Sequence, residues 1–578
     1  MYTLGINAAF HDPAACLVQD GRVIAAAEEE RFTKIKHGKR PVPFSAWELP
    51  FHAIDSCLAH ANITLCDVDH VAYSFQPAQL LADANAASIA IPLHPARYPP
   101  TREGESPWEP LFLSHLMNAP KQLVDGAPLH LAQRFSGACW DGPHRWHYVD
   151  HHEAHAASAF LVSPFDEAAV MCLDGRGERA TTTYWMGHGA ELERLGRVEM
   201  PHSLGLLYED VTHHLGFLRS SDEYKVMALA SYGAPTVADE FRSMIRRGED
   251  GAFTIEAARL TERFGPARDR GAPLEQRHLD VARSLQLVLE ETVMGLARWL
   301  RARTGTPALC MAGGVALNCV MNSRLRDARI FDQLWVQPAA GDAGTALGAA
   351  LVVDARERGA STHASMEHAY LGPAYEDDEI EHLLRWAKLP YRLVTDVAEA
   401  TASLLADNKV VGWFQGAMEF GPRALGARSI LASPIDPAMQ ARLNELKDRE
   451  DFRPVAPVVV EEEAGDWFEG AGVAPYMLFV FDVRTDRADR IPAVRHVDGT
   501  ARVQTVRRDQ NPRYYDLLRA FQRRTGVPVL VNTSFNTRGE PIVCTPRDAI
   551  ESFWTSPLDA LAIGSFLVEK PATMQVSR

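Results

Sequence analysis

The sequence has no CxxC pair, no long apolar run and no excess of basic residues. Its eight cysteines are scattered over 578 residues. Several lie within apolar stretches, so we expect small buried side chains and no disulfide scaffold. No run reaches the roughly 18 apolar residues that a membrane-spanning helix needs. The N-terminus also lacks the basic and apolar regions of a signal peptide. We therefore expect a cytoplasmic protein that does not act at a membrane.

The charge balance limits the partners. The formal net charge is −16, and the chain is 46% hydrophobic and 23% charged, as in globular proteins. Nonspecific nucleic-acid binding depends on cations that neutralise phosphates, so we expect no nucleic-acid partner. The length is enough for two to four ordinary domains. No internal repeat or low-complexity tract is evident, and the apolar spacing predicts a long helix over 279–303.

Two histidines one helical turn apart are the first candidate ligands. His151 and His155 are spaced i, i+4 and would share one helix face, where both can hold one metal ion. His152 with His155, spaced i, i+3, is an alternative pair. Histidine pairs of this kind are also common on solvated faces, so the pair alone does not establish a metal site.

Two aspartates strengthen the metal interpretation. Asp174 follows the strand-like run 168–173, and Asp342 follows the strand-like run 333–336 and precedes a helix of small residues. Two histidines and two aspartates make a mixed nitrogen and oxygen site. Such a site suits iron, zinc or manganese rather than calcium.

Glycines near these residues indicate a phosphate cradle. Gly175 and Gly177 follow the first aspartate, and Gly313 and Gly314 lie between a strand-like run and a helix. Glycine lets backbone N–H groups approach a phosphate closely. Close packing would explain the glycines equally well. Three strand-like runs at the N-terminus, with Asp-Gly at 20–21 between the second and third, resemble the opening of actin-type and sugar-kinase-type ATPases.

The C-terminal part has its own cluster of cations. Arg423 and Arg428 border a glycine-containing turn, and segment 447–454 adds Lys447, Arg449 and Arg453. Arginine side chains match phosphate oxygens geometrically, so we predict a second anion site here. A boundary near 359–376 predicts two domains, 1–360 and 361–578, with an irregular insertion at about 75–146 in the first.

Several ordered motifs match a known family. They are AEEERFT at 27–33, HHEAH at 151–155, DGRGE at 174–178, DEYKVM at 222–227, GGVALN at 313–318, GPRALGARS at 421–429, KDREDFRP at 447–454 and NTSFNTRGE at 532–540. From end to end, the chain resembles the O-carbamoyltransferases of antibiotic biosynthesis and nodulation-factor decoration. It looks closer to the nebramycin-type members, which act on aminoglycoside-type sugars, than to the shorter and more divergent members.

The resemblance implies an α/β protein with two domains. The first would have the ASKHA (actin and sugar-kinase) fold with a duplicated βββαβα core, and the second would be YrdC-like. The second domain would convert carbamoyl phosphate and ATP, with Mg²⁺, to carbamoyl adenylate. At the metal site of the first, the carbamoyl group would then pass to a hydroxyl of a sugar-containing natural product, and AMP would leave. The assembly state is open, with a homodimer as one option.

The resemblance also implies roles for individual residues. The metal ligands would be His151, His155, Asp174 and Asp342. Gly313, Gly314 and Asn318 would line the adenosine of the intermediate, next to Gly175 and Gly177. His11, Asp12, Lys36 and Asp222 would lie near the reacting carbonyl, with Asp222 or His11 as the base. Carbamoyl phosphate and ATP would be held by Arg423, Arg428, Lys447, Arg449, Arg453, Arg502 and Ser534.

The chain departs from the family pattern at three positions. Ala417 stands where many members carry arginine, and Tyr224 and Ala228 stand where glycines are frequent. A side chain at Tyr224 would narrow the approach to the site and reshape the acceptor pocket.

Three other functions remain to be distinguished. They are an ASKHA-type small-molecule kinase, a threonylcarbamoyl-type tRNA-modifying enzyme and a nucleotide-sensing module without activity. Pyrophosphate release that depends on carbamoyl phosphate would separate the transferase from all three.

Overall fold

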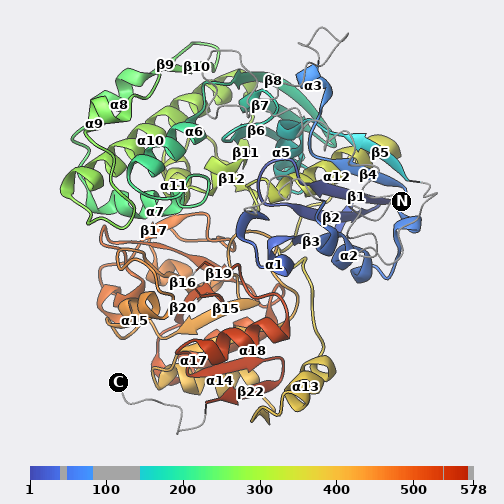
Figure 1. The fold of residues 1–578 in the computed structure, drawn as a ribbon, viewed down its shortest axis with the longest axis vertical. Coiled ribbons are helices and arrows are strands. Elements are labelled where there is room, and N and C mark those ends of the chain that lie inside the picture. The colour runs from blue at the N-terminus through green and yellow to red at the C-terminus, as the bar shows by residue number, and fades with distance from the viewer. Residues whose placement is uncertain (39–48, 82–143, 538, 571–578) are drawn as a thin grey trace. The chain divides into compact units, whose positions relative to one another are not determined.

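A computed structural model describes residues 1–38, 49–81, 144–537 and 539–570 (Figure 1). Most of the insertion predicted at about 75–146 lies outside the described residues. The chain divides into two compact units. Unit 1 comprises Met1–Val226 and Gly233–Met366, and unit 2 comprises Met227–Tyr232 and Glu367–Arg578.

The first sheet of unit 1 has the order β3-β2-β1-β4-β5. Its strands are β1 (Tyr2–Asn7), β2 (Ala14–Gln19), β3 (Arg22–Glu28), β4 (His70–Tyr73) and β5 (Arg145–Tyr148). The first three form an antiparallel meander, whereas β4 pairs in parallel with β1, and β5 with β4. The predicted turn between β2 and β3 is confirmed. Asp20 and Gly21 have φ angles of 50° and 84°, the left-handed conformation that a tight hairpin requires.

The second sheet repeats the first. Its order is β12-β11-β6-β7-β8, with β6–β7–β8 as the antiparallel meander and β11 and β12 added in parallel. The strands are β6 (Glu167–Leu173), β7 (Ala180–His188), β8 (Glu191–Glu199), β11 (Ala308–Ala312) and β12 (Gln333–Val336). This duplicated order confirms the ASKHA-type core.

Helices connect and cover these strands in unit 1. They are α1 (Glu30–Thr33), α2 (Phe51–His60), α3 (Ala78–Leu81), α5 (His151–Phe160), α6 (Leu204–His214), α8 (Ala238–Met244), α9 (Leu260–Phe264), α10 (Gln276–Thr304), α11 (Cys319–Asp327) and α12 (Ala343–Arg358). Helix α7 (Glu223–Leu229) follows α6, and a small hairpin contains β9 (Ile245–Arg247) and β10 (Phe253–Ile255). The helix predicted over 279–303 is confirmed as α10.

A close contact between α5 and α12 fixes the centre of unit 1. Helix α12 packs against α5 and β1, and its first three turns consist of small and apolar residues that are buried. At Gly348, an added Cβ would lie 1.8 Å from the carbonyl oxygen of Ala154. Only glycine allows the two helices to approach this closely.

Unit 2 is built on an eight-stranded mixed sheet with the order β13-β22-β21-β14-β15-β20-β16-β19. The strands are β13 (Arg392–Leu393), β14 (Val411–Phe414), β15 (Arg428–Ala432), β16 (Ala456–Val460), β19 (Gln504–Val506), β20 (Val529–Ser534), β21 (Ala560–Ile563) and β22 (Phe566–Glu569). Strands β17 (Val480–Asp482) and β18 (Thr500–Arg502) form a separate pair. The helices are α13 (Asp377–Trp386), α14 (Val397–Ala406), α15 (Met439–Leu446), α16 (Ala464–Trp467), α17 (Pro512–Thr525) and α18 (Pro546–Thr555). The YrdC-like identity of this unit stays a prediction.

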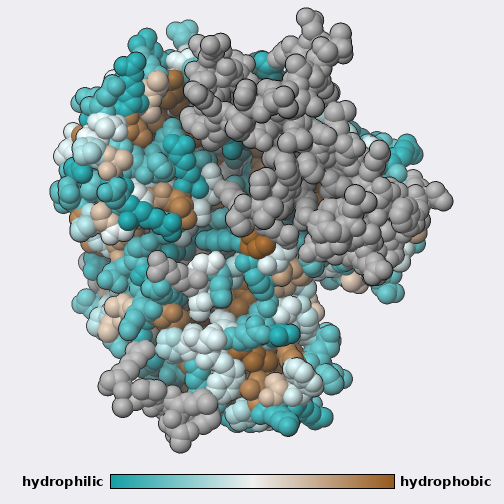
Figure 2. All heavy atoms as spheres, in the orientation of Figure 1, coloured by the Kyte–Doolittle hydropathy of each residue, from teal (hydrophilic) through white to brown (hydrophobic). Residues whose placement is uncertain are grey.

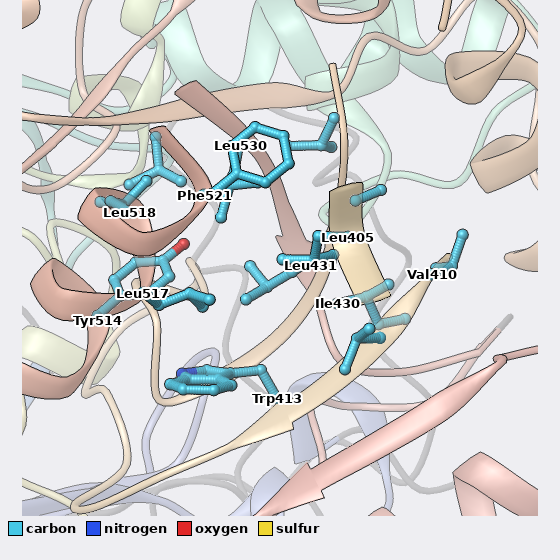
Figure 3. Packing of buried hydrophobic residues seen from close by; sticks show 14 of the residues in the cluster. Leu405, Val410, Trp413, Ile430, Leu431, Tyr514, Leu517, Leu518, Phe521 and Leu530 are labelled. Atoms are coloured by element: carbon cyan, nitrogen blue, oxygen red, sulfur yellow. The ribbon is translucent and has the colours of Figure 1, made fainter. Parts of the chain in front are cut away.

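The core of unit 2 is packed between α17 and the sheet (Figure 3). Tyr514, Leu517 and Phe521 recur along one face of α17 and are fully buried. They face side chains of the central strands, among them Leu431, which is 0% exposed. This core fixes β15 and β20, the strands whose ends carry Arg428 and Ser534 of the predicted anion site.

Among the described residues, six cysteines are free and buried, whereas Cys66 is disulfide-bonded, which the sequence did not indicate.

On the face shown in Figure 2, hydrophobic residues form small groups among hydrophilic ones. Within the described ranges, no helix combines the length and apolar character needed to cross a bilayer.

Replacing Leu431 tests this packing. Leu431→Ala should cost about 3 kcal/mol of unfolding free energy, because it removes buried methyl groups and leaves a cavity. Leu393→Ala is the control, since that side chain is 69% exposed and its loss should cost less than about 0.5 kcal/mol. Denaturant unfolding measures both. Equal costs would contradict the core assignment.

Candidate functional site

The four predicted metal ligands converge in the interior of unit 1. His151 and His155 come from α5, Asp174 follows β6, and Asp342 is the residue before α12. The Nε2 atoms of His151 and His155 lie 3.6 and 3.5 Å, respectively, from Oδ1 of Asp342, and 3.8 and 4.0 Å from Oδ2 of Asp174. Both histidines are fully buried, and the two aspartates are 6% and 8% exposed.

Hydrogen bonds orient three of the four ligands, whereas neither ring nitrogen of the buried His155 has a hydrogen-bond partner among the described residues. The Nδ1–H of His151 donates to the carbonyl of Ser74 (3.3 Å), so Nε2 is the nitrogen that faces the carboxylates. Oδ1 of Asp174 accepts the N–H of Gly314 (2.8 Å), and Oδ2 of Asp342 accepts the N–H of His11 (3.2 Å). The other oxygen of each carboxylate faces the histidines, and that of Asp174 also accepts the N–H of Arg176 (3.3 Å).

These residues fit a divalent metal ion. The Nε2 atoms of His151 and His155 are buried and have no hydrogen-bond partner, a costly arrangement for polar atoms unless a ligand binds them. Donor separations of 3.5 to 4.0 Å leave room for one ion among the four side chains. The nitrogen and oxygen set is the one predicted from the sequence.

The structure also distinguishes His151 from His152. The Nδ1 of His152 contacts the hydroxyl of Thr183 (3.1 Å), and His152 is not part of the metal-binding group. Burial lowers the pKa of His152 to about 4, so its imidazole is neutral at pH 7. The alternative pair of His152 with His155 is therefore not formed.

Mutual charge stabilises the ligand group. Burial alone would lower the pKa of His151, but the nearby negative charges of Asp174 and Asp342 raise it well above its ordinary value. Burial raises the pKa of each aspartate, and the histidines more than offset this, so that both carboxyl pKa values are lowered. The aspartates are thus carboxylates, the form that binds metal.

A second polar group lies beside the ligands, in the loop after β1. Asp12 accepts a hydrogen bond from Nδ1–H of His37 (2.8 Å), and its other oxygen lies 3.3 Å from Nδ1 of His11. Nε2 of His37 contacts the hydroxyl of Ser221 (3.1 Å). Asp12 and His37 have φ angles of 48° and 61°, which are uncommon for residues other than glycine and cluster at functional sites.

The other two predicted catalytic residues have different surroundings. Asp222 accepts the N–H of Leu218 (3.0 Å) and pairs with Lys225 (3.1 Å), so both its oxygens are engaged. The ammonium of Lys36 lies 5.9 Å from the ring centre of Tyr224, the residue that replaces a family glycine. The departure at Tyr224 thus places an aromatic ring beside a predicted catalytic cation.

The predicted nucleotide-binding glycines lie around Asp174. Gly313 has a φ of 92°, and an added Cβ would lie 2.2 Å from the carbonyl oxygen of Leu173, so no other residue fits there. Gly314 donates to Asp174, while Gly175 and Gly177 follow it. Asn318 caps α11 and exchanges hydrogen bonds with Gln286 (2.8 and 3.1 Å). Its predicted contact with adenosine stays a prediction.

In unit 2, the structure brings Lys447 and Ser534 together. The ammonium of Lys447 donates to the carbonyl (2.5 Å) and hydroxyl (3.2 Å) of Ser534 and to the side chain of Asn536 (2.6 Å). Arg449 donates to Asn444 (2.6 Å), and Arg453 lies 3.6 Å from Glu450. Arg502 ends β18, and Arg423 is half-buried in the loop between β14 and β15.

Arg428 differs from the other predicted anion ligands. It is fully buried, and its guanidinium donates to four backbone carbonyls while it stacks 3.7 Å from the ring centre of Phe414. Burial lowers its pKa. These contacts hold the loop in shape, and the phosphate contact assigned to Arg428 stays a prediction.

Sequence reasoning missed three residues that organise the site. Asn7 is fully buried and donates to the carbonyls of His11 (2.7 Å) and Asp12 (3.1 Å). Ser74 donates to Asn7 (3.1 Å), and the third residue is His37. A polar residue at the end of an apolar strand was a usable signal for Asn7. No sequence pattern linked His37 to Asp12.

Comparison with known proteins identifies the family. A carbamoyltransferase N-terminus model matches residues 2–351, and a carbamoyltransferase C-terminus model matches residues 402–570. The chain belongs to the carbamoyltransferase family, and it is an enzyme that transfers carbamoyl groups. The recognition made from the sequence motifs is thereby confirmed.

Relatives match over nearly the whole chain. The uncharacterized protein sll1178 of Synechocystis is 40% identical over 99% of this chain and 97% of its own length. Nodulation protein NolNO of Sinorhizobium fredii is 38% identical over 98% of this chain and 80% of its own.

Likenesses to solved structures are weaker. Component A of (R)-2-hydroxyglutaryl-CoA dehydratase from Acidaminococcus fermentans has a TM-score of 0.33 and 15% identity, over 62% of this chain and 99% of its own. HypF of T. kodakarensis has a TM-score of 0.31 and 13% identity, over 62% of this chain and 48% of its own. Neither carries an argument about function.

Metal content tests the ligand assignment. His155→Ala should reduce metal affinity about 100-fold or more, because it removes one of four ligands. His152→Ala is the matched control from the same buried turn and should retain the metal. Elemental analysis after equilibrium dialysis against Fe²⁺ or Zn²⁺ measures both. Equal loss in the two variants would contradict the assignment.

Proposed function

We propose that the enzyme is an ATP-dependent O-carbamoyltransferase that works in two half-reactions. Unit 2 forms carbamoyl adenylate from carbamoyl phosphate and ATP, and unit 1 transfers the carbamoyl group to a hydroxyl of a small molecule. The observation that carries the proposal is the match to both carbamoyltransferase models on a chain with a charged site in each unit.

The first half-reaction must consume water to balance. Cleavage of carbamoyl phosphate by water gives carbamate and phosphate. An oxygen of carbamate then attacks the α-phosphorus of ATP, which forms carbamoyl adenylate and releases pyrophosphate. One carbamoyl phosphate, one ATP and one water therefore give one carbamoyl adenylate, one phosphate and one pyrophosphate.

Cations of unit 2 would hold the phosphates in this step. Lys447 is 6% exposed and sits among oxygens of Ser534 and Asn536, at the end of β20. We assign Arg423, Arg449, Arg453 and Arg502 to the phosphate oxygens, because guanidinium groups bind such oxygens in pairs. ATP would enter with Mg²⁺.

In the second half-reaction the acceptor hydroxyl attacks the carbamoyl carbon, and AMP leaves. A bound divalent ion, which we assign as iron with zinc or manganese as alternatives, would neutralise charge on the leaving phosphate. His11 is our choice as the group that takes the hydroxyl proton. Asp12 faces its Nδ1, which leaves Nε2 as the basic nitrogen, whereas both oxygens of Asp222 are engaged.

The acceptor is assigned by class. We propose a hydroxyl of a sugar-containing natural product, on the strength of the sequence resemblance. The aromatic ring of Tyr224 beside Lys36 would narrow the acceptor side of the site. Glycine at this position in other family members would leave that space open.

Pyrophosphate release tests the first half-reaction. Without acceptor, the enzyme should release pyrophosphate from ATP only when carbamoyl phosphate is present. Arg423→Ala should reduce this release about 100-fold, because a phosphate loses its bidentate partner. Arg392→Ala, on the edge strand β13, is the control and should be unaffected. ATP cleavage at the same rate with and without carbamoyl phosphate would overturn the proposal.

Variants of the loop after β1 test the second half-reaction. His11→Ala should slow carbamoyl transfer to an acceptor such as an aminoglycoside about 100-fold or more, because it removes the base. The same variant should keep carbamoyl-phosphate-dependent pyrophosphate release in the first turnover. A parallel loss of both activities would argue against a division of labour between the two sites.

A further inference from the structure

One buried carboxylate, that of Glu419, accepts hydrogen bonds from several backbone N–H groups at the end of the loop between β14 and β15, residues 415–427. Oε1 of Glu419 accepts the N–H groups of Leu425 (2.7 Å), Ala427 (2.7 Å) and Arg428 (3.2 Å). Glu419 is only 3% exposed. Three donors on one oxygen fix the backbone directly after Arg423, the residue assigned to phosphate.

Side chains from other parts of unit 2 donate hydrogen bonds to the carbonyl groups of the same segment. Tyr370 and Gln504 both donate to the carbonyl of Leu425 at 2.8 Å. Asn532 donates to that of Ala424 (3.0 Å), and Trp413 donates to that of Gly426 (2.9 Å). Residues 424–428 therefore have most of their backbone polar groups bound by side chains.

Close packing at Gly426 also restricts this segment. Gly426 has a φ of 105°, and a Cβ there would lie 2.2 Å from the ring of Tyr514. Tyr514 belongs to the packed face of α17, which is fully buried. The loop is thus tied to the core of unit 2.

Stability alone does not explain a carboxylate at this place. Burying a charge costs several kcal/mol, and apolar residues often replace buried ion pairs without loss of stability. The carboxylate of Glu419 lies near the buried Arg428, whose guanidinium donates to the carbonyls of Gln415 and Ala427, at the two ends of the loop. Buried polar networks of this kind specify one geometry.

We infer that Glu419 is a positioning residue for the anion site of unit 2. Its carboxylate holds the backbone of 425–428 so that Arg423 is fixed before carbamoyl phosphate arrives. Arg428 acts with Glu419, because its guanidinium binds carbonyls of the same loop. This inference rests on the proposed function for the assignment of Arg423, but the hold on the loop can be tested separately.

The experiment compares Glu419→Gln with Asp559→Asn. Asp559 also accepts a backbone N–H, from Val410 (2.7 Å), and pairs with Arg442 (2.7 Å), but it lies at the opposite end of β14. Glu419→Gln should raise the KM for carbamoyl phosphate in the pyrophosphate assay about 10-fold or more, since misplaced binding groups lose affinity. It should also speed hydrogen exchange about 10-fold in peptides that cover 421–428. Asp559→Asn should lower the melting temperature while neither the KM nor this exchange changes.

The two readouts separate the two ideas. If the wild-type enzyme releases no pyrophosphate with carbamoyl phosphate, the proposed function fails, and exchange still decides whether Glu419 holds the loop. Exchange in Glu419→Gln within twofold of wild type would overturn the inference. An unchanged KM in a variant whose loop exchanges faster would also overturn it, because the held backbone of 425–428 would then not position Arg423.

Discussion

Two buried histidines that face two buried carboxylates constrain most of unit 1. Ionisable groups are removed from water at great cost unless they compensate one another or bind an ion. His151 and His155 do so with Asp174 and Asp342 at 3.5 to 4.0 Å, and the surrounding hydrogen bonds serve to keep that geometry. The close contact of α5 with α12 brings the histidines to Asp342, and the buried Ser74–Asn7 link joins His151 to the loop that contains His11.

The duplicated fold explains how distant parts of the sequence reach this group. Helix α5 closes the first repeat and begins at His151, and helix α12 closes the second and begins directly after Asp342. Asp174 follows the first strand of the second repeat, while His11 and Asp12 follow the first strand of the first. The ligands and the polar loop therefore come from corresponding positions of the two repeats, at the edge where strand ends meet.

The sequence predicted local features better than tertiary ones. The hairpin at Asp20-Gly21 and the helix α10 follow from turn chemistry and apolar spacing, which are local. The choice of His151 over His152 depends on how α5 packs, so spacing alone left it open. His37 reaches Asp12 only through a left-handed backbone turn, and Arg428 binds carbonyls because its loop folds over it. Neither contact can be predicted from the types or the spacing of these residues.

The most direct test of the account is which bond of ATP the enzyme breaks. Phosphorus NMR of the wild-type enzyme with ATP, Mg²⁺, carbamoyl phosphate and a hydroxyl acceptor distinguishes the two outcomes. The account predicts AMP and pyrophosphate in equal amounts, with one phosphate for each, because adenylate formation breaks the bond at the α-phosphorus. Formation of ADP would show transfer of the terminal phosphate instead and would contradict the two-step carbamoyl transfer.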